Sequence, residues 1–218
     1  MRSRFGLILL LLKQGLDPGQ ILTKLALRKV LLGSDRILEV GCGKSPNMQW
    51  LGVKHSTGID GFAPYLEAAR QQKLHHELVL GDARELEKYF KPGQFDAVVA
   101  LDLIEHLTKE DGLKMMRSME SIAGRKVVFF TPSGFLPQRS YENNSLQEHL
   151  SGWEAAEMRQ FGYHVTGLLG PKKLRGELHV LKRRPNFFWG TISLLCQLFW
   201  TRWDPSNAAA ILCVKTKP

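Results

Sequence analysis

The sequence has little cysteine. Its three cysteines, Cys42, Cys196 and Cys213, are odd in number and widely spaced, so they predict neither a disulfide framework nor a zinc site. A chain of 218 residues buries roughly 70% of its unfolded surface when it folds, which is enough for a core without covalent or metal support. We therefore expect a single folded domain in a reducing, cytoplasmic compartment.

The sequence also lacks a long apolar run. The run at 5–12 follows two arginines and imitates a secretion signal, but Lys13 ends it and no small-residue cleavage site follows. It is far shorter than the ~20 apolar residues that a membrane-spanning helix needs. We expect it to cover the domain or to lie on a surface, within an N-terminal helical cover of residues 1–34.

Acidic residues are outnumbered by basic ones, and the formal net charge is +9. A positive balance attracts phosphates on nucleic acid, lipid or cofactor, and it carries no information about the fold. Many of the late cations crowd one segment: Lys172, Lys173, Arg175, Lys182, Arg183 and Arg184. A solvated basic surface that aids solubility is the alternative interpretation of this cluster.

Apolar runs and helix signals alternate along the chain. Strands are expected at 37–40, 56–60, 77–81, 95–101, 126–130, 163–169 and 208–215. Helices are expected at 17–33, 46–52, 64–73 and 84–90, from the Thr108 cap to Gly124, and from the Ser151 and Glu154 cap to Gly162. This alternation predicts an α/β fold, in which a doubly wound and mostly parallel sheet of seven strands carries helices on both faces.

Two stretches interrupt the alternation. Residues 131–150 are rich in Pro, Gly, Ser and Asn, and we interpret this long loop as a lid. Residues 171–206 form an insertion between the last two strands. It holds the basic cluster and a helix whose polar and small residues share one narrow stripe, while the rest of the helix is apolar. The stripe consists of Gly190, Ser193, Gln197 and Thr201.

A glycine turn follows the first expected strand. Gly41 and Gly43 allow the backbone to turn sharply and to approach a ligand without Cβ atoms in the way. Asp60 ends the second strand, 21 residues after Glu39, and an acid at about this spacing can accept hydrogen bonds from ribose hydroxyls. The turn, GCGKSP, lacks the third glycine of G-x-G-x-x-G, which disfavours a pyrophosphate-binding dehydrogenase and suits a nucleoside cofactor without pyrophosphate.

Four ordered motifs carry a family resemblance. ILEVGCG at 37–43, GID ending at Asp60, GDA at 81–83 and FDAVVALDLIEHL at 95–107 together resemble the class I S-adenosylmethionine-dependent methyltransferases of Rossmann-like fold. The resemblance implies S-adenosylmethionine as the cofactor of a methyltransferase domain at 35–218. It also implies that the sheet ends in an antiparallel hairpin of the last two strands.

The resemblance also implies cofactor-binding residues. They are Glu39, Gly41, Cys42 and Gly43 around the methionine portion of the cofactor, Asp60 and Gly61 at the ribose, Asp82 and Ala83 at the adenine, and Leu101 and Asp102 at the floor of the cofactor site. Each motif alone is weak. The four motifs together, in this order along the chain, disfavour the alternative that the glycines only make a tight turn.

Methyl transfer needs an acceptor held in line with the methyl group, and a base when the acceptor atom carries a proton. His106 and His149 are the candidate bases, because an imidazole titrates near neutral pH. Each has a structural alternative. His106 can pack beside the helix that opens at Thr108, and His149 can be an exposed loop histidine.

A metal set is a further hypothesis. Asp102, Glu105 and His106 are spaced i, i+3 and i+4, which places them on one face if the turn is helical. With His149 they offer two carboxylates and two imidazoles, as divalent metals accept. A similar acid-x-x-Glu-His pattern with a later His resembles small-RNA 2′-O-methyltransferases and O-methyltransferases of ubiquinone synthesis. The first acid here is the shorter Asp, and no metal ligand is assigned.

The acceptor is the least determined part. No Asn/Asp-Pro-Pro-aromatic tetrad follows the fourth strand and no cysteine is placed to attack a pyrimidine, which disfavours DNA adenine and covalent pyrimidine chemistry. We expect a small or lipid-like acceptor that is methylated at oxygen, with nitrogen as the next alternative. The cations and aromatic rings of residues 182–203 suit peripheral contact with a membrane. The alternative is that this helix belongs to the core or to a dimer interface, with its apolar face buried. An RNA methyltransferase and a silent cofactor-binding fold are the rival functions, and nucleic acid is less favoured because no RNA-binding module is recognisable.

Overall fold

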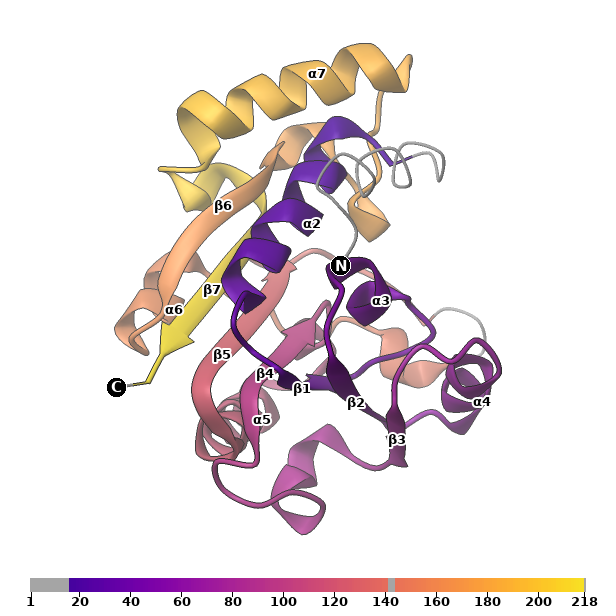
Figure 1. Cartoon of the computed structure of the whole chain (residues 1–218). Coiled ribbons are helices and arrows are strands. Elements are labelled where there is room, and N and C mark those ends of the chain that lie inside the picture. Colours follow the sequence, from indigo (N-terminus) through magenta and orange to yellow (C-terminus); the bar gives the residue numbers. More distant parts are fainter. Residues whose placement is uncertain (1–15, 141–143, 218) are drawn as a thin grey trace.

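The computed structural model describes residues 16–140 and 144–217, which form one seven-stranded sheet with its helices (Figure 1). The strands are β1 (Arg36–Val40), β2 (His55–Asp60), β3 (Glu77–Leu80), β4 (Phe95–Leu101), β5 (Ala123–Pro132), β6 (His164–Pro171) and β7 (Ala208–Thr216). Their order is β3-β2-β1-β4-β5-β7-β6. β1 to β5 are parallel, whereas β7 lies antiparallel between β5 and β6. The predicted fold class, with its final antiparallel hairpin, is confirmed.

The carboxyl ends of the central strands meet at one edge of the sheet. Val40, at the end of β1, pairs with Ile59 in β2 and with Ala100 in β4. The chain order reverses here, because β2 and β3 lie on one side of β1 and β4 and β5 on the other. Ligands of open parallel sheets bind at such a reversal, so the turns after β1, β2 and β4 outline a candidate site.

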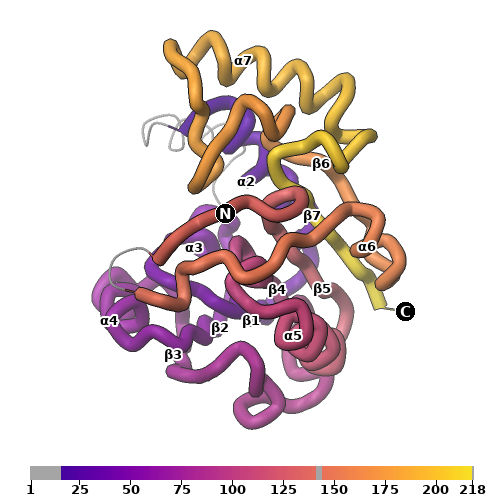
Figure 2. The backbone as a smooth tube through the Cα atoms, turned by 180° about the vertical axis from the view of Figure 1, so that it is seen from behind, coloured from indigo at the N-terminus to yellow at the C-terminus, as the bar shows by residue number. Residues whose placement is uncertain are grey.

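Helices cover both faces of the sheet (Figures 1 and 2). They are α2 (Pro18–Leu31), α3 (Asn47–Leu51), α4 (Ala63–Gln71), α5 (Lys109–Ile122), α6 (Ala155–Gln160) and α7 (Asn186–Cys196), which continues into a π turn at Gln197–Thr201. α5 and α6 pack on one face and α2 and α3 on the other. α7 lies outside the sheet, against α2 and β6 (Figure 1). No helix among the described residues has the length and apolar character to cross a bilayer.

Two helices begin at the predicted caps. The Asp17 carboxylate accepts from the N–H groups of Gly19 and Gln20, and the Gln20 side chain accepts from the Asp17 N–H at 3.1 Å. This reciprocal capping box starts α2. The Thr108 hydroxyl oxygen accepts from the Asp111 N–H at 3.2 Å and starts α5 in the same way. The apolar run at 5–12, predicted to cover the domain, lies outside the described residues.

Two predicted helix ends are wrong. α5 does not end at Gly124, because Ala123 already has extended backbone angles and opens β5. Ser151 does not cap α6, which begins after Glu154 instead. The Ser151 hydroxyl is used elsewhere, since it accepts from Trp153 Nε1 at 3.0 Å. A sequence pattern shows which residues are able to cap a helix, but not which of them a tertiary contact has already engaged.

The helix predicted at 84–90 is a 3₁₀ turn. The Asp82 carboxylate accepts from the Arg84 N–H at 2.8 Å, and this local bond starts a tight turn. Glu85 then leaves helical geometry, with φ −132° and ψ 32°, so regular α-helical bonding does not develop. The other predicted helices and strands are present with their ends shifted.

Candidate active site

The turn after β1 lies closely against its neighbours. Gly41 and Cys42 both donate their N–H groups to the Ile59 carbonyl, at 2.8 and 3.1 Å. Gly41 has a φ of +65°, and a Cβ added there would lie 2.5 Å from Leu103 Cδ1. Gly43 has a φ of +54°. Glycine is therefore the residue that suits both positions, and the turn presents bare backbone at the carboxyl edge of the sheet.

Asp60 joins this turn to the one after β2. Its Oδ2 accepts from the Gly43 N–H and its Oδ1 from the Phe62 N–H, each at 2.8 Å. Burial raises the pKa of Asp60, and these two hydrogen bonds act in the opposite direction. The carboxylate thus lies at the predicted edge and holds two turns in place. A carboxylate oxygen can accept a second hydrogen bond, so this role is compatible with ribose binding.

Asp82 follows β3 at the same edge, and a neighbouring cation engages it. Arg84 donates from Nε to both carboxylate oxygens at 2.9 Å, and from Nη2 to Oδ2 at 2.5 Å. These bonds lower the pKa of Asp82. The Arg84 side chain is half exposed, and exposed ion pairs are weak. Arg84 therefore competes for the acceptor positions that the sequence assigned to an adenine, beside Ala83.

A covering segment, residues 133–140 and 144–154, crosses this edge of the sheet. It runs from the end of β5 toward α4 and returns toward α6 (Figure 2). A backbone hydrogen bond from the His149 N–H to the Gln138 carbonyl, at 3.1 Å, ties its two arms together. Leu146 reaches to 3.4 Å from the position that a Cβ on Gly61 would take. This segment contains most of the predicted lid, whose first two residues belong to β5 instead.

A chain of polar contacts runs beneath the glycine turn. Lys24 Nζ donates to Asn47 Oδ1 at 2.5 Å, and Asn47 Nδ2 donates to Glu39 Oε1 at 3.1 Å. His75 Nε2 lies 3.3 Å from Glu39 Oε2, without hydrogen-bond geometry. Burial lowers the pKa of Lys24. Of these residues the sequence marked only Glu39, because the contacts depend on how α2 and α3 pack.

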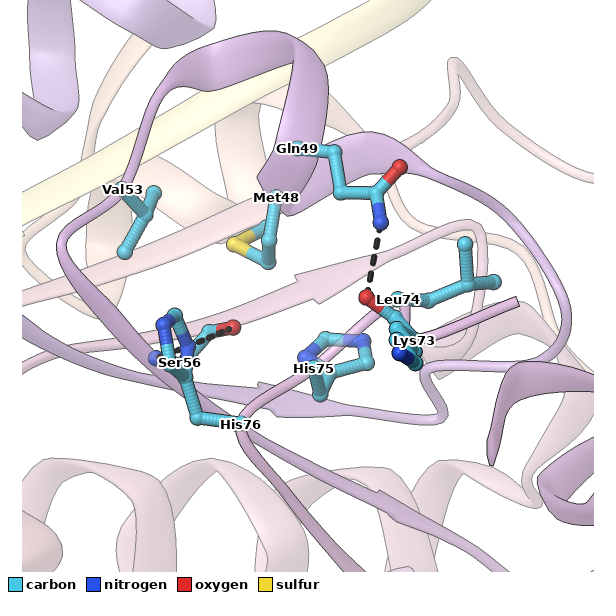
Figure 3. A pocket seen from close by; sticks show the side chains of 8 residues that line it. All are labelled: Met48, Gln49, Val53, Ser56, Lys73, Leu74, His75 and His76. Atoms are coloured by element: carbon cyan, nitrogen blue, oxygen red, sulfur yellow. Dashed lines mark hydrogen bonds between the residues drawn. The ribbon is translucent and has the colours of Figure 1, made fainter. Parts of the chain in front are cut away.

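A separate pocket of about 270 Å³ lies beside α3 (Figure 3). Residues of α3, the start of β2 and the segment 73–76 line it. Inside it, the Ser56 N–H donates to His76 Nδ1 at 3.0 Å. None of the predicted cofactor residues lines this pocket. It lies at the end of β2 opposite Asp60, and the contact between His75 and Glu39 connects it with the strand that leads into the glycine turn.

The imidazole rings of the two histidines predicted as bases are in contact. The ring centroids of His106 and His149 are 4.7 Å apart. His106 Nδ1 lies 3.2 Å from the Glu148 carbonyl oxygen, and His149 Nδ1 lies 2.6 Å from that of Leu136. A carbonyl only accepts, so each Nδ1 carries the hydrogen and each Nε2 the lone pair. Burial lowers the pKa of both imidazoles, which keeps these lone pairs free near neutral pH.

Glu105 forms a compact group with these histidines. Its buried carboxyl accepts from the Thr131 hydroxyl at 2.9 Å, and burial raises its pKa. One ligand atom from each of Glu105, His106 and His149 lies within 4.8 Å of the others. One carboxylate and two imidazole nitrogens form a donor set that suits a divalent transition metal.

Asp102 does not join this group, contrary to the helical-face hypothesis. The turn at Ile104–His106 is 3₁₀, and Asp102 precedes it with a φ of +52°. Its Oδ1 lies 2.9 Å from His179 Nε2 instead. The proposed set of four metal ligands is therefore reduced to three, and Asp102 has a different partner.

His179 was not among the predicted site residues. It lies in a short hairpin, residues 175–181, within the insertion that joins β6 to β7. Arg175 holds this hairpin, donating to the His179 carbonyl and to the Asp17 carboxylate, each at 2.7 Å. The ring of His179 lies 5.3 Å from that of Phe130. No motif marks this histidine, because its contact with Asp102 joins residues 77 positions apart.

Residues 37–123 match a family model described as a methyltransferase domain. The match spans the glycine turn, both aspartates at strand ends and the turn that carries His106. These residues are an S-adenosylmethionine-dependent methyltransferase domain. No curated protein matches the chain.

Solved structures share the fold of this methyltransferase. A SAM-dependent methyltransferase from Archaeoglobus fulgidus is 15% identical, with a TM-score of 0.57 over 90% of this chain and 93% of that one. Magnesium protoporphyrin IX methyltransferase from Synechocystis PCC 6803, with bound SAM, is 15% identical, with a TM-score of 0.53 over 92% and 80%. The methyltransferase domain of bacterial CtHen1 is 18% identical, with a TM-score of 0.54 over 89% and 97%.

The cofactor of this methyltransferase is S-adenosylmethionine, and the chemistry of the edge fits it. The Gly41 and Gly43 turn admits close approach without offering a pyrophosphate cradle, and the Asp60 carboxylate suits hydroxyl groups. Cys42 and Leu101 are buried beside this turn and at the end of β4. Burial raises the pKa of Cys42, so its thiol stays protonated and is not a nucleophile.

Proposed function

We propose that this methyltransferase transfers the methyl group to an oxygen atom of a small or lipid-like acceptor. One observation carries the proposal. The turn after β4, the covering segment and the 175–181 hairpin bring His106, His149 and His179 together with acidic partners at the carboxyl edge. A hydroxyl acceptor must lose a proton as it is methylated, and neutral imidazoles are suited to take it.

The cofactor supplies an electrophilic methyl group, so the protein needs mainly to position the acceptor and to remove its proton. In the proposal the glycine turn and Asp60 hold the cofactor, with Glu39 beneath. His106 and His149 remain the proposed bases, since each directs an Nε2 lone pair away from its backbone partner. His179, oriented by Asp102, is a third candidate.

A metal-assisted version of this reaction rests on Glu105, His106 and His149. Their donor atoms fit a divalent ion, which would polarise the acceptor oxygen and lower its pKa. Chelation followed by added divalent ion tests this version directly. Turnover that chelator abolishes and the ion restores supports it, and turnover that chelator leaves unchanged removes it.

The lipid-like character of the acceptor is proposed from the exposed apolar residues of the insertion. Leu178 and Val180, on the hairpin that reaches Asp102, are 62% and 49% exposed. Peripheral membrane contact through residues 182–203, from the cytoplasmic side, is part of the same proposal. An apolar acceptor chain would find matching surface beside the site.

Labelled methyl transfer tests the proposed function. The protein is first titrated calorimetrically with S-adenosylmethionine and its demethylated product, then incubated with labelled cofactor and separate lipid, metabolite and RNA fractions. Label in the lipid or metabolite fraction, stable to base hydrolysis as an ether is, supports the proposal. Label in RNA favours the RNA methyltransferase. Tight cofactor binding without transfer to any fraction favours the silent fold.

Substitutions test which of the three histidines is the base. Asparagine can keep the donor bond of Nδ1 to a backbone carbonyl while it removes the Nε2 lone pair, so His106→Asn and His149→Asn test the base with little change in packing. His179→Asn tests the third candidate. His55→Asn, on the half-exposed far end of β2, is the matched control. The base is the histidine whose replacement lowers kcat steeply while cofactor affinity stays constant.

A further inference from the structure

α7 and its π turn have the reverse of the usual orientation of an amphipathic helix. Their polar stripe faces the protein and their apolar residues face outward. The stripe is buried, with Ser193 at 0% and Gln197 at 1% exposure. The exposed apolar residues are Phe187, Phe188, Leu195, Leu198, Phe199, Trp200 and Trp203. Phe187 and Phe199 are each 81% exposed and Trp203 75%. Soluble single-chain proteins rarely expose such a contiguous apolar surface unless it binds something.

The orientation of α7 is fixed by hydrogen bonds to β6. The Ser193 hydroxyl donates to the Leu169 carbonyl at 2.7 Å, and Gln197 Oε1 accepts from the Leu169 N–H at 2.8 Å. A Cβ added to Gly170 would lie 2.3 Å from the Ser193 carbonyl oxygen, so helix and strand touch backbone to backbone. Rotating the helix would leave the buried Leu169 N–H without a partner, which is strongly unfavourable, and would remove one of the two donors to its carbonyl, the other being Arg175 Nε. The apolar face therefore stays outward.

Cations frame this apolar face. Lys182, Arg183 and Arg184 are exposed before α7, and Arg202 is exposed beyond its other end. The sequence between Glu177 and Asp204 contains no acidic residue. The Arg183 guanidinium lies 4.8 Å from the centroid of the Trp189 ring. Long basic side chains beside aromatic rings suit the boundary between lipid headgroups and acyl chains.

The same charges disfavour a second copy of this chain as the partner. In a two-fold dimer each patch faces its own copy. Four cations would then confront four cations across the interface, with no acid in the patch to offset them, and such like-charge pairing is unfavourable. An anionic surface offers complementary charge and apolar surface together.

We infer that α7 and its π turn lie flat on a bilayer that contains anionic phospholipid, with the aromatic face in the acyl boundary and the four cations at the phosphates. This inference deepens the proposed function and rests on it only for the lipid-like acceptor. The 16 residues of this segment are about 24 Å long, which suits a surface-lying helix. Each cation near an anionic surface strengthens binding about fivefold.

The docked orientation brings the membrane close to the active site. Lys182 is three residues from His179, whose imidazole pairs with Asp102. Three residues span at most about 11 Å. An amphiphilic acceptor held at the phosphate level would therefore have its head group near the carboxyl edge of the sheet.

Vesicle sedimentation tests the inference with the full chain. Vesicles of phosphatidylcholine alone are compared with vesicles that also contain phosphatidylglycerol. The apolar variant combines Phe187→Ser, Phe199→Ser and Trp203→Ser, all at strongly exposed positions. The charge variant combines Arg183→Gln and Arg184→Gln. The control is Leu32→Ser, at a position 53% exposed at the end of α2.

The wild type and the control should bind phosphatidylglycerol vesicles equally, and salt should weaken the binding. The apolar variant should lose at least about 100-fold in affinity. The charge variant should lose about 30-fold and its preference for the anionic vesicles. Circular dichroism and calorimetric titration with S-adenosylmethionine should give the same result for all variants, since the changed residues lie away from the glycine turn.

Three results would overturn the inference. The first is absence of binding to anionic vesicles at low salt. The second is binding that the apolar variant retains. The third is a stable dimer in light scattering that the apolar variant converts to monomer, which would mean that a second copy covers the face. A flat cofactor titration with intact vesicle binding would instead refute the proposed function and leave the membrane inference standing.

Discussion

Replacing Asp60 with asparagine should weaken cofactor binding through the turn that Asp60 holds. Its two oxygens accept separately from the Gly43 and Phe62 N–H groups. An asparagine has one acceptor oxygen, so its amino group must face one of these donors. The loss of one charged hydrogen bond costs about 1.5–3 kcal/mol, which predicts about 10-fold to 150-fold weaker binding of S-adenosylmethionine in calorimetric titration.

Asp96→Asn is the matched control at the opposite edge of the sheet. Asp96 also accepts from two backbone N–H groups, those of Asp35 and Arg36, at 2.9 and 2.8 Å, but a single oxygen takes both. The amide oxygen of an asparagine can keep both bonds, so cofactor affinity should stay at the wild-type value. Affinity within twofold of wild type for Asp60→Asn, or an equal loss in both variants, would show that the reasoning about the turn is wrong.

Two further predictions concern stability. Arg175→Met should lower the free energy of unfolding by about 3–5 kcal/mol, because Asp17, 2.7 Å away with its side chain 9% exposed, would lose its buried partner; urea unfolding measures this, and the double variant with Asp17→Asn should regain part of the loss. Acidification should also destabilise the fold, since His106 and His149 have pKa values lowered by burial from 6.5. Below pH 6.5 the unfolded chain therefore binds more protons than the folded chain. The stability that is present above pH 6.5 is lost as the pH falls toward the pKa of the folded state, by up to about 1.4 kcal/mol per pH unit for each histidine. Urea unfolding at several pH values measures the slope, and an equal slope in the His106→Asn/His149→Asn variant would contradict this account.

Local signals in the sequence predicted the sheet and its turns. The Asp17 capping box and the Thr108 cap involve residues three positions apart, and the chain forms them without distant partners. The glycines at 41 and 43 and the alternation of strands and helices are equally local. These features predicted the fold class and the edge of the sheet at which the predicted cofactor residues lie.

The partners of the site residues were not predictable in this way. Asp102 was grouped with Glu105 by helical spacing, but the turn is 3₁₀ and His179 is its partner. Lys24 reaches Glu39 through Asn47 only because α2 packs beside α3. Such contacts depend on long-range packing, and no spacing along one segment encodes them.

The orientation of α7 was also determined partly by the sequence and partly by tertiary packing. The sequence determined that its small and polar residues form one stripe, because residue spacing fixes which side chains share a face of a helix. It did not determine which face turns inward, and the usual expectation is that the apolar face does. Tertiary structure decided the opposite, because the buried backbone groups of Leu169 need hydrogen-bond partners, and Ser193 and Gln197 supply them. An unpaired peptide group buried at this contact would cost about 1–3 kcal/mol, and the polar stripe is the face of α7 that can pair with it.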